Sequence, residues 1–250
     1  MFSDTESRSI LRLLTPADYV TLTNAVCGLA AIFLIGLNHV EWGVLLIFAA
    51  ILGDGLDGLV ARSGYGNGPF GAKLDSFADF LNFCVAPAVL LYHTYYQWEI
   101  ITQLRGPDVL TSIAVTTVAG SLVVLGMLRL VRFEVLKGNE RSDYFVGLPT
   151  PAASIPITLA AFLGWSPQVA LPLTLAIALL MVSRVRFPKI RGALILPAVA
   201  GLLGTIFLRD QYGDLLPQLL FYGMVAYVVA GPLLVWWREE SVEPEPPLAS

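Results

Sequence analysis

The sequence is poor in charged residues, which make up 14% of its 250 residues, whereas hydrophobic residues make up 56%. Soluble domains carry about 25% charged and about 45–50% apolar residues. Because 15 basic and 19 acidic side chains cannot solvate so apolar a surface, the composition excludes a water-soluble domain and a disordered chain. The net charge of −4 also excludes a generally basic, nucleic-acid-binding protein.

Cysteine and histidine are scarce too, with two residues of each in the chain. Cys27 and Cys84 both lie in apolar runs, where a free cysteine packs as a small hydrophobic residue. Two isolated thiols make neither a disulfide framework nor a zinc pattern. The sequence therefore excludes a fold held together by disulfides or by zinc.

Long apolar runs are what the sequence has in abundance, and runs of about 17–25 residues suit helices that span a bilayer. We predict an all-α integral membrane bundle of about eight transmembrane helices. The expected divisions are a cytoplasmic juxtamembrane segment over 1–15, a transmembrane domain over 16–238 and a disordered acidic tail over 239–250. The apolar runs cover residues 19–38, 42–62, 76–96, 110–132, 148–164, 167–183, 192–208 and 217–236. Gly164, Ser166 and Pro167 predict a tight turn between the fifth and sixth runs.

The positions of the basic residues predict an orientation for this bundle. If both termini are cytoplasmic, all of the 15 Lys and Arg residues except Arg105 and Arg209 fall on the inner side. Cytoplasmic loops carry the excess of Lys and Arg in membrane proteins. The asymmetry therefore favours cytoplasmic termini and an even number of helices.

Four aspartates lie where membrane segments should carry no charge. Asp54 and Asp57 are three residues apart near the inner end of the second run, and Asp75 and Asp79 are four apart at the start of the third. Each pair shares one helix face, and the short connection makes the two helix ends neighbours. An aspartate at a membrane-helix centre costs about 2.5–3.5 kcal/mol, and four carboxylates also repel one another. Divalent cations offset this cost, and oxygen ligands favour Mg²⁺, Mn²⁺ or Ca²⁺ over zinc.

The residues between the aspartates indicate what such ions would bind. A salt-bridge cluster is the structural alternative, but Arg62 and Lys73 supply only two compensating charges. Four glycines in residues 63–74 would let a ligand approach the backbone closely, although a flexible turn has the same composition. A pyrophosphate is a sensible ligand beside two metals and Arg62, and such an arrangement suits phosphoryl transfer.

The aspartate motif resembles the signature of the CDP-alcohol phosphotransferase family. It reads Asp54-x-x-Asp57-Gly58-x-x-Ala61-Arg62, and after a gap of eight residues Gly71-x-x-x-Asp75-x-x-x-Asp79. The phosphatidylserine synthase branch of that family is resembled by residues 128–133 and 144–153. The likeness extends over about residues 15–155, and we expect the family-like core to cover about residues 16–185. Asp18, Asn82, Cys84 and Glu134 depart from that branch.

The resemblance implies a role for each matching residue. It makes Asp54, Asp57 and Asp75 ligands of two divalent cations, Mg²⁺ or Mn²⁺, and Asp79 both a ligand of the second metal and the general base. The reaction implied is attack of the serine hydroxyl on the lipid-side phosphorus of a CDP-lipid, with CMP leaving. The implied contacts to the CDP-lipid are Thr21, Asn24, Gly58, Ala61, Arg62 and Gly71.

The acceptor site is expected at Arg129 and Arg132, which lie three residues apart at the inner membrane boundary. The planar guanidinium fork of arginine matches the carboxylate that serine carries. The alternative is ordinary anchoring by side chains that reach the headgroup region. The implied partners are a CDP-lipid, L-serine, membrane lipids and a second copy of the chain, with no nucleic acid.

The predicted enzyme is an integral protein of the cell membrane with its active site on the cytoplasmic side. Two other functions are alternatives to serine transfer. The same chemistry with glycerol phosphate or inositol phosphate would require more basic residues around the acceptor. A cation-coupled transporter also uses intramembrane carboxylates, but transporters place them near the midplane, often between inverted repeats. Here the aspartates lie at one end of the expected helices, and no repeat is evident.

Overall fold

The computed structural model describes most of the chain as helices. It covers residues 14–62, 69–102, 109–136, 144–189, 195–208 and 213–241, without the side chains of 56–62, 69, 97–102, 195–199, 206 and 238–241. The predicted segment 1–15 and tail 239–250 therefore lie almost wholly outside the described residues. Helix α10 ends at Ser241, three residues beyond the expected domain boundary at 238.

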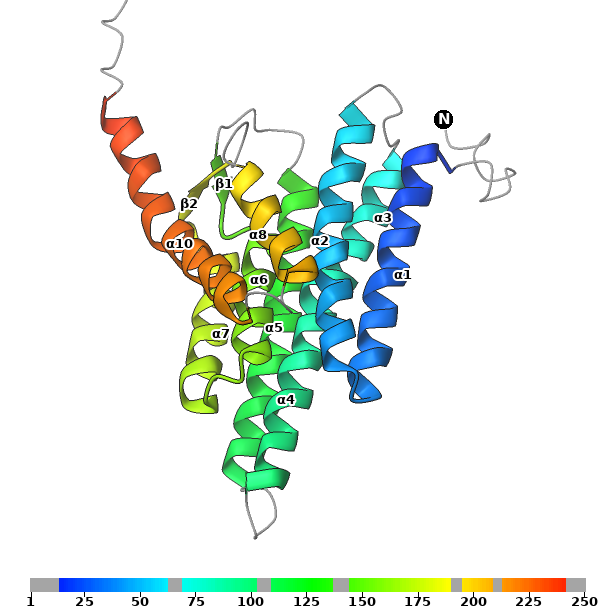
Figure 1. The fold of residues 1–250 in the computed structure, drawn as a ribbon. Helices are drawn as coiled ribbons and strands as arrows, with labels where there is room; N and C mark the ends of the chain where they lie inside the picture. The colour runs from blue at the N-terminus through cyan, green and yellow to red at the C-terminus, as the bar shows by residue number, and fades with distance from the viewer. Residues whose placement is uncertain are drawn as a thin grey trace, which may run out of the picture.

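Each of the apolar runs found in the sequence lies on helix (Figure 1). The third run belongs to α3, a π-helical turn η2 and α4, which follow one another without a break. The turn expected at Gly164 separates α6 from α7. The elements are α1 Pro16–Gly36, α2 Val40–Arg62, α3 Pro69–Phe80, η2 Leu81–Val85, α4 Ala86–Thr102, α5 Val109–Leu136, β1 Tyr144–Val146, α6 Thr150–Phe162, α7 Pro167–Val182, β2 Arg186–Pro188, α8 Ile195–Phe207 and α10 Leu215–Ser241.

Four segments within the described residues are long and apolar enough to cross a membrane, and this supports an integral membrane protein. They are Pro16–Gly36, Phe70–Tyr96, Val109–Leu136 and Leu215–Trp237. Helices α6 and α7 are apolar but shorter. The membrane character is thus confirmed, whereas the count of eight spans stays a prediction.

A two-stranded ribbon is the one departure from an all-helical fold that the described residues show. β1 pairs with β2 antiparallel, with Phe145 opposite Phe187. Each strand has three residues, and both lie in connections between helices. A period-2 pattern needs about four residues to be recognisable, so strands this short give no signal in the sequence.

Helix α6 is the centre of the bundle, since nearly every residue from Thr150 to Ala161 is buried. Its small side chains let α4, α7 and α10 pack close to its backbone. The Tyr95 hydroxyl of α4 donates a hydrogen bond to the Ala160 carbonyl across 3.3 Å. Pro156 lies inside α6, where neighbouring helices can compensate for the missing backbone donor.

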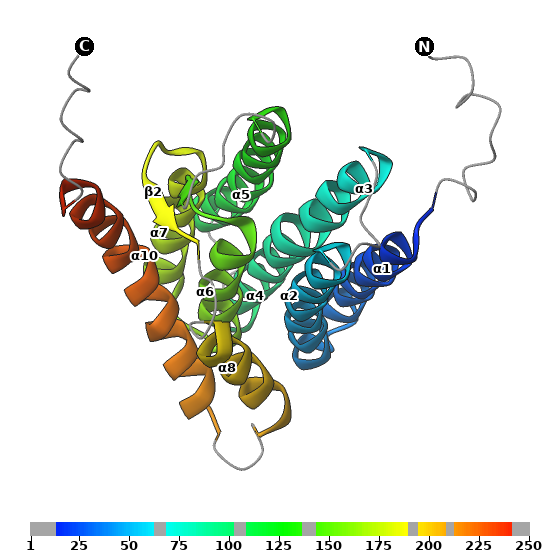
Figure 2. The ribbon, with the colours of Figure 1, turned by 90° about the horizontal axis from the view of Figure 1, so that it is seen from above.

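The segments that carry the sequence motifs meet at one end of the bundle. The end of α2, the start of α3, the end of α5 and the β1–β2 ribbon all lie at the upper end in Figure 1. Viewed from that end, α1, α2 and α3 form one group, with α5, α6 and α7 beside them (Figure 2). The beginning of α1 and the end of α10 lie at this same end, as an even number of passes requires.

Candidate active site

Three of the four predicted aspartates come together in the structure. Asp54 lies near the end of α2, and Asp75 and Asp79 lie one turn apart on α3. One carboxylate oxygen from each lies within 4.8 Å of the others. All three side chains are half-buried. The side chain of Asp57 lies outside the described residues, so its place in the cluster stays a prediction.

The cluster has the composition that a hard divalent cation requires. Three carboxylates this close repel one another strongly in a membrane bundle, and a cation between them would remove the repulsion. Oxygen ligands are the ones that Mg²⁺ and Mn²⁺ prefer. The residues present therefore fit a divalent metal, and the carboxylates of Asp54, Asp75 and Asp79 are the groups that could hold it.

Arg129 brings a positive charge to the same place. It lies on α5, is only 7% exposed, and its charge acts on both Asp79 and Asp54. Its Nη1 donates to the hydroxyl of Thr150 across 3.3 Å, and its Cζ lies 5.2 Å from the centre of the Phe133 ring. Among the contacts of the described residues, the bond to Thr150 engages one nitrogen of a guanidinium that has five donors. Arg129 can therefore bind a further anionic group beside the aspartates.

Arg132 lies one turn further along α5, but its guanidinium binds backbone carbonyls. Its Nη1 donates to the carbonyls of Val182 and Ser183 across 3.0 and 3.1 Å. Its Nη2 donates to the carbonyls of Val146 and Met181. The bonds to Met181, Val182 and Ser183 satisfy carbonyls at the end of α7 that lack helical partners, and the bond to Val146 reaches β1. Arg132 thus joins α5, β1 and α7, and its predicted role in binding the acceptor stays untested.

Of the six predicted contacts to the CDP-lipid, three lie among the residues whose burial the structure describes and three do not. Thr21 and Asn24 are buried on α1, where the Thr21 hydroxyl donates to the Ala17 carbonyl across 3.3 Å. Gly71 is buried near the start of α3. The backbone of the remaining three belongs to the end of α2, but their side chains lie outside the described residues; they are Gly58, Ala61 and Arg62.

Asn82 is a buried polar residue to which the sequence assigned no role. It lies in the π-helical turn, three residues after Asp79, and within the described part of the chain neither polar atom of its carboxamide has a hydrogen-bond partner. A Cβ at Gly28 of α1 would overlap this carboxamide, so the two residues fit only as a pair. π-Helical turns are frequent at functional sites. The signal in the sequence was that Asn82 departs from the phosphatidylserine synthase pattern that the surrounding residues resemble.

Thr150 is another residue that the sequence did not single out. Thr150 lies in the first turn of α6 and is fully buried. Its hydroxyl accepts the hydrogen bond that Arg129 donates. Residues 144–153 carry part of the family resemblance, but nothing in their pattern indicates which member contacts an arginine. The contact depends on how α5 packs against α6, which only the structure reveals.

Comparison with known proteins agrees with this geometry. The family model described as CDP-alcohol phosphatidyltransferase matches residues 14–184. The CDP-diacylglycerol–serine O-phosphatidyltransferase of Methanocaldococcus jannaschii is 32% identical over 222 residues, which cover 88% of this chain and 98% of that protein. The archaetidylserine synthase of Methanothermobacter thermautotrophicus is 31% identical over 198 residues, which cover 77% of this chain and 76% of that protein.

A bacterial relative gives the same result. The CDP-diacylglycerol–serine O-phosphatidyltransferase of Bacillus subtilis is 30% identical over 172 residues, which cover 69% of this chain and 89% of that protein. The matched region contains all three clustered aspartates and Arg129. The resemblance inferred from the aspartate motif is therefore confirmed, and the chain belongs to the CDP-alcohol phosphatidyltransferase family.

Proposed function

We propose that this protein transfers a phosphatidyl or archaetidyl group from a CDP-lipid to the hydroxyl of L-serine and releases CMP, a step of membrane phospholipid biosynthesis. The observation that carries the proposal is the juxtaposition of the Asp54–Asp75–Asp79 cluster with Arg129 in a member of this family. The names of the relatives in M. jannaschii and B. subtilis, both serine phosphatidyltransferases, support serine as the acceptor.

Asp54, Asp57, Asp75 and Asp79 would hold two divalent cations, Mg²⁺ or Mn²⁺. Bound there, the cations would neutralise the diphosphate and the charge that develops on it. Support for this comes from the oxygen donors of Asp54, Asp75 and Asp79, which already converge within 4.8 Å. Arg62 and the glycines Gly58 and Gly71, together with Ala61, Thr21 and Asn24, would bind the cytidine diphosphate part of the substrate.

Asp79 would act as the general base. It would take the proton from the serine hydroxyl as that oxygen forms a bond to the lipid-side phosphorus. The bond from this phosphorus to the bridging oxygen of CMP would break, so that CMP leaves with the electron pair. No covalent bond to the enzyme is needed, because the acceptor oxygen attacks directly.

Arg129 would bind the serine carboxylate. Its burial strengthens a charge-assisted hydrogen bond, and its position beside Asp79 would bring the serine hydroxyl near the base. Arg132 would contribute to the acceptor site chiefly by holding the end of α7 and β1, since its donors face backbone carbonyls. Substitutions of the two arginines, measured by steady-state kinetics and thermal unfolding, would separate these two roles.

The active site would lie on the cytoplasmic side of the cell membrane. Support comes from the basic residues near it, since Arg129, Arg132, Arg186 and Lys189 all belong to segments at this end of the bundle. The proposal further includes eight transmembrane helices and a homodimer. Both can be measured on the purified protein in detergent or nanodiscs.

CMP release by the purified protein tests the function directly. CDP-diacylglycerol and CDP-archaeol would each be offered with serine, glycerol phosphate or inositol phosphate in the presence of Mg²⁺ or Mn²⁺. Of the three acceptors, we expect only serine to give CMP and a new phospholipid, one that carries serine. Turnover with a phosphorylated alcohol instead would change the acceptor but keep the chemistry, whereas CMP release from no combination would refute the proposal.

A further inference from the structure

Three basic side chains lie on or beside strand β2 of the two-stranded ribbon. Arg186 begins the strand, Arg184 lies two residues before it, and Lys189 directly follows it. Arg184 and Arg186 are exposed, and Lys189 is half-buried. Because residues 183–189 contain no acidic residue, this segment is strongly positive. We call Arg184, Arg186 and Lys189 the basic ribbon patch.

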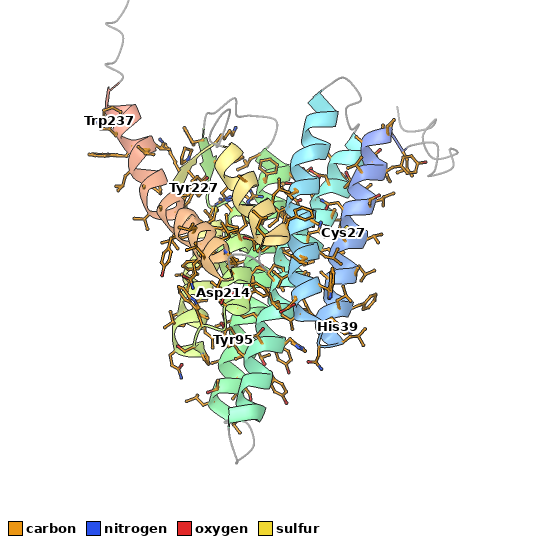
Figure 3. The ribbon with its side chains drawn as sticks, in the orientation of Figure 1. Cys27, His39, Tyr95, Asp214, Tyr227 and Trp237 are labelled. Atoms are coloured by element: carbon orange, nitrogen blue, oxygen red, sulfur yellow. The ribbon has the colours of Figure 1, made fainter. Side chains whose placement is uncertain are left out.

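The buried side of β2 holds the basic ribbon patch in place. The fully buried Phe187 ring lies 6.0 Å from the ring of Tyr227, which Figure 3 marks on α10. The Tyr227 hydroxyl donates to the Pro188 carbonyl across 3.0 Å, and a Cβ at Gly231 would lie 3.0 Å from the Pro188 ring. On the other side, Arg132 joins β1 and α7 to α5. The patch therefore belongs to an element that α5 and α10 both fix.

Aromatic rings of β1 position two of the cations. The Cζ atom of Arg186 lies 4.8 Å from the centre of the Tyr144 ring, and the Nζ atom of Lys189 lies 5.2 Å from the centre of the Phe145 ring. The face of an aromatic ring attracts a cation without removing its charge. The two side chains are therefore oriented by the ribbon itself and can still attract an anion.

Helix α10 adds an apolar surface beside the patch. It packs against β2, and Trp237 lies at the end of α10 that is uppermost in Figure 3. Four large apolar side chains within six residues of Gly231 are each between 55% and 63% exposed. They are Leu233, Leu234, Trp236 and Trp237. Six residues of helix span about 9 Å, and tryptophan is enriched where lipid headgroups meet hydrocarbon chains. Cations and apolar side chains thus lie side by side near the membrane surface.

We propose that the basic ribbon patch binds the headgroup phosphate of an anionic phospholipid, whose chains lie along the exposed apolar side chains at the end of α10. Charge complementarity carries the inference, because basic sites between transmembrane helices bind anionic headgroups. The adjoining surface of α10 favours a phosphate that carries hydrocarbon chains over a free anion. This site goes beyond the proposed function and does not depend on it.

The alternative is that these cations only orient the bundle. An orientation signal acts while the helices insert and needs no headgroup contact in the folded protein. A lipid site, in contrast, persists after purification and prefers one class of headgroup. Binding to the purified protein in detergent therefore distinguishes the two, since its helices have already been inserted.

Native mass spectrometry tests the site by counting bound lipids. Purified full-length protein in a nonionic detergent would be titrated with phosphatidylglycerol or with phosphatidylcholine of the same chain length. We expect phosphatidylglycerol to bind about tenfold more tightly or better, and an equal concentration of inorganic phosphate not to displace it. Equal binding of the two lipids would overturn the proposal. Complete displacement by inorganic phosphate would show a site for a free anion and would overturn it as well.

Two matched double variants locate the binding. Arg184→Gln with Arg186→Gln removes two charges, whereas Arg184→Lys with Arg186→Lys keeps both. We expect the glutamine pair to weaken binding of phosphatidylglycerol about tenfold or more, and the lysine pair to retain it. Binding of phosphatidylcholine and the unfolding temperature in phosphatidylcholine nanodiscs should be the same in both, because the replaced side chains are exposed.

Two results with these variants would refute the assignment. If the glutamine pair still preferred phosphatidylglycerol as strongly as the parent protein, the anionic lipid would bind elsewhere. If the glutamine pair dissociated a dimer while the number of bound lipids stayed constant, the patch would be a contact between two copies of the chain.

Discussion

The Arg132 guanidinium on α5 donates to the Val182 carbonyl at the end of α7 across 3.0 Å. The same group also reaches Ser183, and Val146 in β1, so one side chain joins three elements. The charge of Arg129, one turn earlier, instead acts on Asp79 and Asp54. Two arginines that look equivalent in the sequence therefore meet different chemical groups.

Replacing each of these arginines should have a different consequence. Arg132→Ala should lower the thermal unfolding temperature, because it leaves carbonyls at the end of α7 without donors, at about 1–3 kcal/mol for such a group. Arg129→Ala should raise the KM for serine at least tenfold while leaving binding of CDP-lipid nearly unchanged. Thermal unfolding in detergent and steady-state kinetics would measure both effects.

A lysine variant is the matched control for the Arg132 substitution. Arg132→Lys keeps the charge but loses the planar fork, so it should still unfold at a lower temperature than the parent protein. If Arg132→Lys restored full stability, the residue would act only through its charge, as an anchor on the cytoplasmic side. If Arg132→Ala specifically raised the KM for serine, it would join Arg129 in the acceptor site.

Removing one carboxylate from the cluster should remove the metal dependence together with the activity. Asp54→Asn and Asp75→Asn should each abolish detectable turnover, because each takes away a charge and an oxygen ligand from the three that converge. Mn²⁺ binding, measured by electron paramagnetic resonance, should weaken in parallel. Full activity of the parent protein in excess EDTA would exclude a metal mechanism.

The general base should be separable from the groups that bind substrate. Asp79→Asn should lower kcat by about 10²–10⁴, the usual effect of removing such a base. Calorimetric binding of the CDP-lipid should change much less, provided that the other aspartates keep their metals. Arg62→Ala should show the opposite balance, with weaker CDP-lipid binding. Normal turnover of Asp79→Asn would place the base elsewhere.

Gly28 and Asn82 should be coupled energetically. Gly28→Ala puts a methyl group where the Asn82 carboxamide lies, and such overpacking costs about 1–3 kcal/mol. Asn82→Ser makes room, so the double variant should be more stable than Gly28→Ala alone. A double-mutant cycle of unfolding temperatures measures the coupling. Strictly additive effects would show that the two side chains do not constrain each other.

Accessibility of single cysteines tests the orientation of the bundle. In a background without Cys27 and Cys84, a cysteine at Asn38 or Gly106 should react with a membrane-impermeant maleimide from outside intact cells. A cysteine at Arg184 should react only after the cells are opened. Reaction of position 106 from the cytoplasm alone would contradict the predicted helix count.

Much of this molecule is predictable from local features of the sequence. Apolar runs long enough to span a bilayer predict helices, because backbone groups in a membrane must bond within their own segment. The capping of α1 is local as well, since the Thr15 amide donates to Asp18 across 2.6 Å. The spacing of Asp75 and Asp79 likewise places both carboxylates on one helix face before any fold is known.

The contacts between helices were beyond that reach. Nothing in the pattern distinguishes Arg129 from Arg132, since both are arginines on one stretch of α5, and the difference arises from the helices that pack against each of them. The π-helical turn at Asn82 and the short β1–β2 ribbon have no recognisable period of their own. The Arg132 bond to the Val182 carbonyl needs α5 and α7 to meet across 50 residues of sequence.

The sequence by itself determined the membrane environment, the helical content and the aspartates that can bind metal, because each follows from hydrophobicity and spacing within a single helix. Only the tertiary structure decided which arginine places its charge near Asp79, which one ties α5 to α7, and which glycine packs against Asn82. The physical reason is that these features depend on close contacts between side chains far apart in the chain, and a one-dimensional pattern does not encode such contacts.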